Sequence, residues 1–223
     1  MLGIIGGTSL LFSTLPDLQK QHVDTPFGNA EIHVGDIVML MRHQNGLPPH
    51  RINFRANMAA LALAGVDRIV AFGSSGSLKP EITPGSLLIP TDYLSVTDIP
   101  SIHDHAIGHV LPELSEDLSQ ELADVIPSAR NGGIYVQTKG PRIETVAEVK
   151  ALATLADVVG MTLASEGTLA CELGMDFAAI CTVDNYANGL GGEVLTYEHI
   201  VSTSHTYRHR SDEILGAIIR GLG

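Results

Sequence analysis

The chain has 223 residues, a formal net charge of −12 at pH 7 and 44% hydrophobic residues. This length allows a large buried core, and the acidic charge argues against a general nucleic-acid binder, which needs a surplus of lysine and arginine. No run of about 18 uncharged apolar residues predicts a membrane span, and no basic segment precedes the first apolar residues as it does in a signal peptide. Cys171 and Cys181 lie in apolar surroundings, which favours reduced thiols in a cytoplasmic protein over a disulfide.

The spacing of apolar residues predicts strands that alternate with helices. We expect strands at 2–5 and, as a pair, at 30–41; a helix at 52–65; strands at 68–73 and 85–94; a helix at 112–126; a strand at 133–138; a helix at 144–156; a strand near 157–161; a helix at 165–174; a strand at 176–183; and a long helix at 193–220. This order predicts an α/β fold with a mixed central β-sheet flanked by helices on both faces. No repeat or break in composition divides the chain, so we expect a single domain over residues 1–223.

Small and polar residues gather where the predicted strands end, at 6–8, 42–43, 73–77, 138–144 and 184–188. Ligands of open α/β sheets bind beyond the strand ends, so we expect these segments to meet at one site. The glycine turn before Thr8 can present N–H groups to an anion, and Arg42 with His43 offers donors suited to phosphate. Taken singly, each is equally compatible with a plain turn or a surface charge. The glycine spacing differs from the dinucleotide-binding fingerprint.

The later strand ends carry an acid, a methionine, a hydroxyl and an amide. Glu144 can accept hydrogen bonds from ring N–H groups if it faces a pocket, or it can simply favour a helix N-terminus. Met161 precedes the hydroxyl of Thr162, although methionine is more often a core residue than a ligand contact. The side-chain amide of Asn185 can donate and accept at once. The chain has ten histidines, but no combined set of cysteines and histidines supports a metal site, and we expect none.

Taken together, nine segments resemble the trimeric purine nucleoside phosphorylases, and above all their methylthioadenosine phosphorylase branch. They are GIIGGT, VDTPFG, the RH pair at 42–43, PPHRINFRAN, SSGSL, PGSLLIPTDYL, QTKGPRIETVAE, GMTLASE and DNYANG. Each is a weak signal alone, but they stand in the same order and cover essentially the whole chain. The resemblance implies a nucleoside phosphorylase-like fold, a purine nucleoside and phosphate as substrates, no cofactor, and a homotrimer or a dimer of trimers.

The resemblance also implies roles for individual residues. Phosphate would be held by Thr8, Arg42, His43, the region of Ser74, and Thr162. The nucleoside would be contacted by Met161 at the ribose, Ile143, Glu144 and Asn185 at the base, Tyr197 and Ile200 at the 5′ end, and His109 from a neighbouring subunit. The implied catalytic set is Asn185, Arg42 and His43.

Two of these positions favour 6-oxopurines. Adenine-specific relatives carry a serine in place of Glu144 and an aspartate in place of Asn185. A carboxylate accepts a hydrogen bond from the protonated ring nitrogen of hypoxanthine or guanine, whereas adenine presents an acceptor there. Such a mismatch costs about 1–3 kcal/mol, so we expect inosine, guanosine or methylthioinosine as substrate.

Several alternatives remain open at this point. The chain could be a methylthioadenosine phosphorylase, a nucleosidase that uses water, or a purine-binding protein without turnover; the glycine turn alone suggests a dinucleotide oxidoreductase. The loop after His43 is shorter than in relatives, and the chain lacks their C-terminal extension over the 5′ end of the sugar. The sequence therefore leaves the 5′ substituent, hydroxyl or methylthio, undecided.

Overall fold

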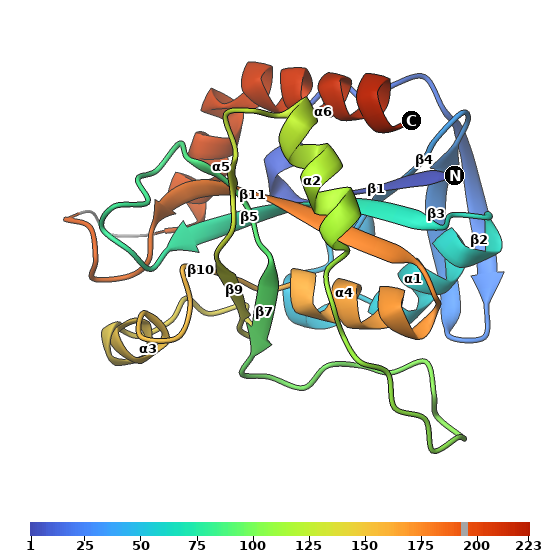
Figure 1. Ribbon diagram of the computed structural model, residues 1–223, viewed down its shortest axis with the longest axis horizontal. Helices are drawn as coiled ribbons and strands as arrows, with labels where there is room; N and C mark the ends of the chain where they lie inside the picture. Colours follow the sequence, from blue (N-terminus) through green and yellow to red (C-terminus); the bar gives the residue numbers. More distant parts are fainter. Residues whose placement is uncertain (193–195) are drawn as a thin grey trace.

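The chain folds into a mixed β-sheet with helices on both faces, as the computed structural model shows (Figure 1). The structure describes residues 1–192 and 196–223, without the side chains at 197, 199 and 200. The strands in these ranges are β1 (Leu2–Gly6), β2 (Gln19–Thr25), β3 (Gly28–Val34), β4 (Val38–Met41), β5 (Arg68–Ser77), β6 (Leu87–Ile89), β7 (Asp92–Ser95), β8 (Arg130–Asn131), β9 (Ile134–Gln137), β10 (Val158–Gly160) and β11 (Asp176–Tyr186). The helices are α1 (Phe54–Leu63), α2 (Glu116–Val125), α3 (Val146–Leu152), α4 (Leu163–Glu172), α5 (Tyr197–Thr206) and α6 (Arg208–Leu222), with the short 3-10 helices η1 (Thr8–Leu10), η2 (Gln44–Gly46) and η3 (Pro49–Arg51) in the loops.

Strand β5 joins the two halves of the sheet because it has neighbours along both edges. One edge pairs in parallel with β11. The other edge pairs first with β1, also in parallel, and then with β10, which runs antiparallel. Beyond β1 the order continues through β4, β3 and β2, and beyond β10 through β9 and β7. Residues that follow β4 and β10 are thereby brought toward the same part of the sheet as the ends of β5 and β11.

Each face of the sheet is covered by its own pair of helices. Ile69 and Ala71 of β5 join the hydrophobic cluster that contains residues of α1 and α4, whereas Val70 and Phe72 join the cluster that contains residues of α2 and α6. Alternate side chains of a strand point to opposite faces, and here both faces are buried. Burial on both sides explains why this part of the strand is continuously apolar. The predicted α/β fold with a mixed sheet is confirmed.

Some predicted boundaries are wrong, and tertiary contacts explain the differences. Strands β5 and β11 continue to Ser77 and Tyr186 because they pair with each other beyond their apolar stretches. The strand predicted at 85–94 is two strands, β6 and β7, separated at Pro90, which has no N–H for a sheet hydrogen bond. The predicted C-terminal helix is two helices, α5 and α6, with Tyr207 between them, and its residues 193–195 lie outside the described ranges. The strands β2 and β8 are not predicted from the sequence.

The structure also bears on the predicted state of the cysteines, on metal ligands and on membrane spans. Cys171 and Cys181 are both free thiols, the first half-buried and the second fully buried. Among the described residues, no three His, Cys, Asp or Glu side chains are grouped as metal ligands. In the same part of the chain, no helix combines the length and apolar character needed to cross a membrane.

Candidate active site

The predicted site residues lie at neighbouring strand ends. Arg42 follows β4, Thr162 follows β10, Glu144 lies between β9 and α3, and Asn185 is close to the end of β11. Arg42 is bonded to Glu166 in the first turn of α4, and the N–H of Glu166 donates to the backbone oxygen of Thr162 at 3.2 Å. These contacts hold Arg42, Glu166 and Thr162 together where β4 ends and α4 begins.

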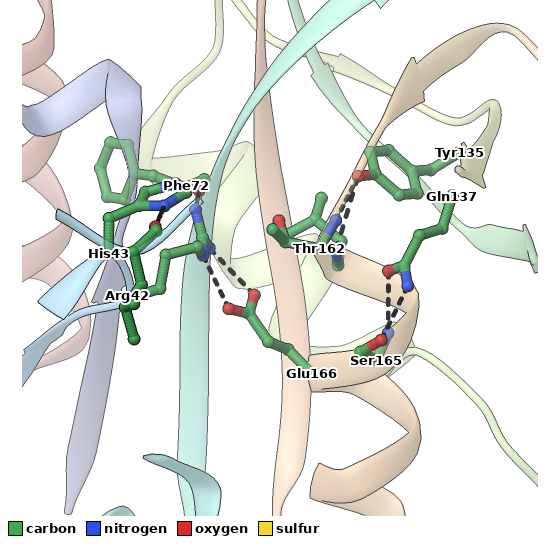
Figure 2. Close-up of polar contacts among 10 residues, drawn as sticks. Arg42, His43, Phe72, Tyr135, Gln137, Thr162, Ser165 and Glu166 are labelled. Carbon is green, nitrogen blue, oxygen red and sulfur yellow. Dashed lines mark hydrogen bonds and ion pairs between the residues drawn. The ribbon is translucent and has the colours of Figure 1, made fainter. Parts of the chain in front are cut away.

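The guanidinium of Arg42 is buried and held in one orientation (Figure 2). Its Nε and Nη2 donate to the two carboxylate oxygens of Glu166 at 2.7 and 2.9 Å, and its Nη1 donates to the backbone oxygen of Phe72 at 2.6 Å. Both charged side chains are at most 3% exposed. Burial raises the pKa of the Glu166 carboxyl, and the charge of Arg42 opposes that rise. Because a guanidinium stays charged in proteins, the two groups form a buried, bidentate ion pair.

Two N–H groups of Arg42 are not used in these bonds. A guanidinium has five N–H donors, and three are engaged, which leaves one on Nη1 and one on Nη2 without a partner in the described part of the chain. Gly7 fits against this group because it has no side chain: a Cβ there would overlap Nη1 of Arg42. The glycine turn at 6–8 therefore packs directly on the guanidinium.

His43 has a defined tautomer. Its Nδ1 lies 2.9 Å from the backbone oxygen of Leu47, and since a carbonyl only accepts, Nδ1 carries a proton. Burial lowers the pKa of His43; the bond to Leu47 opposes this shift, and the adjacent charge of Arg42 adds to it. A neutral imidazole with Nδ1 protonated leaves Nε2 free to accept a hydrogen bond.

The other predicted phosphate ligands carry hydroxyls. The Thr162 hydroxyl makes no capping bond to α4 and no other hydrogen bond within the described residues. The backbone oxygen of Thr8 accepts a hydrogen bond from Ser204 at 2.6 Å, which fastens the glycine turn to α5. The Ser74 hydroxyl donates to the carboxylate of Asp184. An anion near residue 74 would therefore meet its backbone rather than a free hydroxyl.

Asp184 forms a β-bulge beside Asn185. The register between β11 and β5 shifts at this point, so Asp184 is an extra residue in the strand. The residue is 5% exposed, and its carboxylate accepts the hydrogen bond from Ser74. Burial raises the pKa of Asp184 to about 6. The amide nitrogen of Asn185 donates to the backbone oxygen of Tyr186 at 2.8 Å, which fixes the direction of its side chain.

Glu144 is buried with half of its carboxylate engaged. Thr138 donates from Oγ1 to Oε1 of Glu144 at 2.6 Å, whereas Oε2 has no hydrogen-bond partner in the described ranges. Asn188 donates to the backbone oxygen of Glu144 at 2.8 Å and so ties this loop to the segment after β11. The free oxygen can accept a hydrogen bond from a ring N–H.

A cavity of about 280 Å³ lies next to these residues. Met161 lines it together with Thr138 and Gln137, and Phe54 and Ile99 form other parts of the wall. Among the predicted substrate contacts, Met161 alone belongs to this wall in the described structure. The cavity therefore adjoins the predicted site on the Met161 side and does not enclose it.

Of the four remaining predicted substrate contacts, the structure describes the side chains of two, Ile143 and His109. Ile143 is half-buried in the loop before α3. His109 is exposed within the segment 103–113, which projects away from the sheet in Figure 1. Helix α5 begins at Tyr197, but the side chains of Tyr197 and Ile200 lie outside the described residues.

Sequence reasoning assigned no role to Glu166, Tyr135 or Gln137, which the structure places at the site. Glu166 belongs to the GMTLASE segment, one helical turn after Thr162, but no pattern shows that it pairs with Arg42, 124 residues away. Tyr135 and Gln137 are two apart in a predicted strand and so share a face. That spacing was the available signal, although it does not tell which helix the face meets.

Comparison with known proteins gives the family. Residues 1–220 match the family model of the phosphorylase superfamily. A probable 6-oxopurine nucleoside phosphorylase of Archaeoglobus fulgidus is 41% identical over 214 residues, which cover 90% of this chain and 88% of that protein. A probable S-methyl-5′-thioinosine phosphorylase of Methanocaldococcus jannaschii is 35% identical over 214 residues, covering 90% and 84%. The structure of methylthioadenosine phosphorylase from Schistosoma mansoni in complex with adenine has a TM-score of 0.86 at 25% identity, covering 98% of this chain and 90% of that one.

The chain therefore belongs to the phosphorylase superfamily. Within it, the chain falls among the purine nucleoside phosphorylases, which confirms the family resemblance of the nine sequence segments.

The buried ion pair predicts a large difference between two glutamate substitutions. Glu166→Gln leaves the buried charge of Arg42 uncompensated, and we expect the free energy of unfolding to fall by about 3–5 kcal/mol. Glu121 pairs with Arg68 at the surface, where Glu121→Gln should cost less than about 1 kcal/mol. Urea titration of both variants measures the difference, and equal losses would contradict the ion-pair assignment.

Asp184 predicts a pH-dependent stability. Its pKa is about 6 in the folded chain against an ordinary 3.8, so the folded state binds its proton more tightly than the unfolded state does. The buried charge therefore destabilises the fold above about pH 6, and the penalty disappears as the pH falls toward 4. Asp184→Asn removes it, so we expect a gain in unfolding free energy of up to about 3 kcal/mol at pH 8 that vanishes near pH 4. A gain of the same size at both pH values would be the contradictory outcome.

Proposed function

We propose that this protein catalyses the phosphorolysis of 6-oxopurine nucleosides, in which phosphate replaces the base to give a free purine and ribose 1-phosphate or its methylthio analogue. The main support is the buried Arg42, which has two unused N–H groups, packs against the glycine turn through Nη1, and pairs with Glu166 one helical turn after Thr162. Glu144, in the loop after β9, and Asn185, near the end of β11, offer groups for the base, and Asn188 links the two segments by its hydrogen bond to the backbone oxygen of Glu144. The names of two relatives, a 6-oxopurine and a thioinosine phosphorylase, support the same class of substrate.

On the phosphate side, oriented donors bind the anion. In the proposed complex phosphate contacts Thr8, Arg42, His43, the backbone at Ser74, and Thr162. The Arg42–Glu166 pair has no net charge, so fixed N–H and O–H dipoles contribute most of the binding. Arg42 and Thr162 donate to the charged oxygens, while the unprotonated Nε2 of His43 accepts the proton of monohydrogen phosphate.

On the base side, two side chains select the purine. The free carboxylate oxygen of Glu144 accepts a hydrogen bond from the ring N–H of a 6-oxopurine. The amide of Asn185 donates to the oxo group and accepts from the neighbouring ring nitrogen when that is protonated. Ile143 packs on the base and Met161 on the ribose. Adenine would place an unprotonated nitrogen against Glu144, which leaves two acceptors opposed.

The chemistry needs a sugar that gains positive charge and a purine that gains negative charge. The bond between C1′ and the purine nitrogen breaks, its electron pair leaves with the base, and a phosphate oxygen forms the new bond to C1′. Asn185 stabilises the departing base through hydrogen bonds that strengthen as negative charge develops. Arg42, His43 and Thr162 hold phosphate within reach of C1′, where its charge also stabilises the cationic sugar. Phosphate is a co-substrate, and the proposal includes no cofactor or metal.

The proposed enzyme is an oligomer of the cytoplasm. Ile107 is 99% exposed and Leu111 is 83% exposed in the segment 103–113, although apolar side chains of this size are usually buried. A homotrimer, or a dimer of trimers, would cover them and bring His109 to the site of a neighbouring copy, with Tyr197 and Ile200 at the 5′ end. Two free thiols agree with the reducing cytoplasm.

The test is a panel of inosine, guanosine, methylthioinosine and methylthioadenosine, each assayed with and without inorganic phosphate. We expect base release to require phosphate, with kcat/KM for the best 6-oxopurine about tenfold to hundredfold above that for methylthioadenosine. The comparison of inosine with methylthioinosine assigns the 5′ substituent.

Three outcomes of the same panel would contradict the proposal. A preference for methylthioadenosine would make the chain an adenine-type phosphorylase. Base release without phosphate would make it a nucleosidase. Tight binding without product would make it a purine-binding protein.

A further inference from the structure

Ser74 lies on β5 between the glycine turn and the bulge of β11. One edge of β5 pairs with β1, and the turn after β1 stays close to β5, since a Cβ at Gly7 would lie 3.6 Å from the backbone oxygen of Phe72. On the other edge, Ser74 pairs with Thr182 of β11, two residues before the bulge at Asp184. Ser74 therefore connects the proposed phosphate side of the site with the bulge.

The Ser74 hydroxyl cannot donate to an anion while Asp184 is ionised. A hydroxyl has one O–H donor, and Ser74 donates it to the carboxylate of Asp184. The Ser74 oxygen can then only accept a further hydrogen bond, which the ionised oxygens of phosphate do not donate. The carboxylate also places a negative charge one side chain away from the proposed anion, and like charges repel. In this state Asp184 opposes phosphate binding.

No cation among the described residues balances the charge of Asp184. The titratable or charged side chains near it come from β11 and from α6 with its N-cap, and they are Cys181, Tyr207 and Arg210. Arg210 donates to the backbone oxygen of Gly85 and forms no ion pair with Asp184. Burial raises the pKa of the Cys181 thiol to about 12, so it stays uncharged. Strand β6, which pairs with β11, is apolar. Protonation is therefore the way in which Asp184 can lose its charge.

From this geometry we propose that Asp184 is a positioning residue for phosphate, because its protonation reverses the hydrogen bond with Ser74 and frees the Ser74 hydroxyl to donate to the anion. The protonated carboxyl donates to the Ser74 oxygen, and the Ser74 proton turns toward phosphate. The proton comes from the solvent, so phosphate binding is coupled to proton uptake. The inference rests on the proposed function, since phosphate is the co-substrate of that reaction.

The coupling falls near neutral pH. Burial raises the pKa of Asp184 to about 6, and the hydroxyls of Ser74 and Thr182 oppose that rise. The carboxyl is therefore mostly ionised at about pH 7.5 before phosphate binds. A bound anion raises its pKa further, because two neighbouring negative charges disfavour each other. Proton uptake should fade near about pH 5, where Asp184 is protonated with and without phosphate.

Calorimetric titration with inorganic phosphate tests the inference directly. Binding heats in two buffers of different ionisation enthalpy give the number of protons taken up. At about pH 7.5 we expect Asp184→Asn to take up between about half a proton and one proton fewer than the wild type. Phosphate itself and His43 contribute alike in both proteins, so the difference belongs to Asp184. Equal proton uptake by the two proteins would overturn the inference.

A double-mutant cycle tests whether Asp184 acts through Ser74. Asparagine at position 184 keeps the size of the side chain and supplies an N–H donor to Ser74, as the protonated acid does. Asp184→Asn should therefore lower the Kd for phosphate about tenfold at about pH 7.5, as for the gain of one hydrogen bond to a charged ligand. In a Ser74→Ala background the same substitution should lower it by no more than about twofold. An equal gain in both backgrounds would contradict the role of Ser74.

Asp157→Asn is the matched control for net charge. Asp157 also accepts a hydrogen bond, from the N–H of Ile134 at 2.8 Å, but it stands before β10, whereas Thr162 follows that strand. We expect its proton uptake and phosphate Kd to equal those of the wild type, and changes as large as those of Asp184→Asn would contradict the inference.

The failure of the inference is distinguishable from that of the proposed function. Phosphate-dependent turnover by the wild type, with proton uptake that Asp184→Asn leaves unchanged, rejects the inference alone. Base release without phosphate, or a wild type that binds no phosphate, rejects the proposed function and the inference together.

Discussion

The buried ion pair between Arg42 and Glu166 is the interaction on which the candidate site depends. It joins the end of β4 to the first turn of α4, 124 residues further along the chain, and it fixes the plane of the guanidinium. A buried ion pair is often no more stabilising than an apolar pair of the same volume, so stability does not explain its presence. Its presence is better explained by the orientation it gives to Arg42. Glu166 and Phe72 engage three N–H donors of the guanidinium and leave two for a ligand.

The same ion pair limits the kinds of interaction that can hold an anion at the candidate site of this acidic protein. With a net charge of −12, the chain as a whole repels phosphate. Glu166 cancels the charge of Arg42 locally, and the lowered pKa of His43 favours its neutral form at pH 7. In the proposed complex, binding therefore comes from hydrogen-bond donors that are already oriented and partly removed from water, where each is worth more than at the surface. The close packing of Gly7 against the guanidinium maintains such orientation, and the Tyr135 hydroxyl, which accepts the N–H of Thr162 at 3.2 Å, fixes the backbone at the start of α4.

Much of the fold could be predicted from the sequence because burial leaves a periodic signal. The apolar strands around Ile4, Val70 and Ile180 and the helix after Asn53 were found from spacing alone. The polar continuation of β5 to Ser77 was not, because small polar residues have low strand propensity and remain in the sheet only through pairing with β11. Local patterns of small and polar residues also predicted the strand ends at which the candidate site lies.

The partners within the site could not be predicted in the same way. The pairing of Arg42 with Glu166, like that of Ser74 with Asp184, joins segments that are far apart in the chain. Such pairs leave no local pattern of residue spacing in the sequence. The exposed segment 103–113 is tied to the rest of the described chain by the ion pair between Asp104 and Arg55, and this contact assigns no role to His109. The family resemblance supplied candidate roles, whereas the geometry supplies the reasons why Arg42 and Thr162 have free donors.

The most direct measurement is a crystal structure of the protein with inorganic phosphate bound. The account predicts phosphate oxygens within hydrogen-bond distance of the free N–H groups of Arg42 and the hydroxyl of Thr162, with the Arg42–Glu166 pair intact. An anion bound elsewhere, or an Arg42 side chain that leaves Glu166 to reach it, would contradict the claim that this pair presents the guanidinium to phosphate.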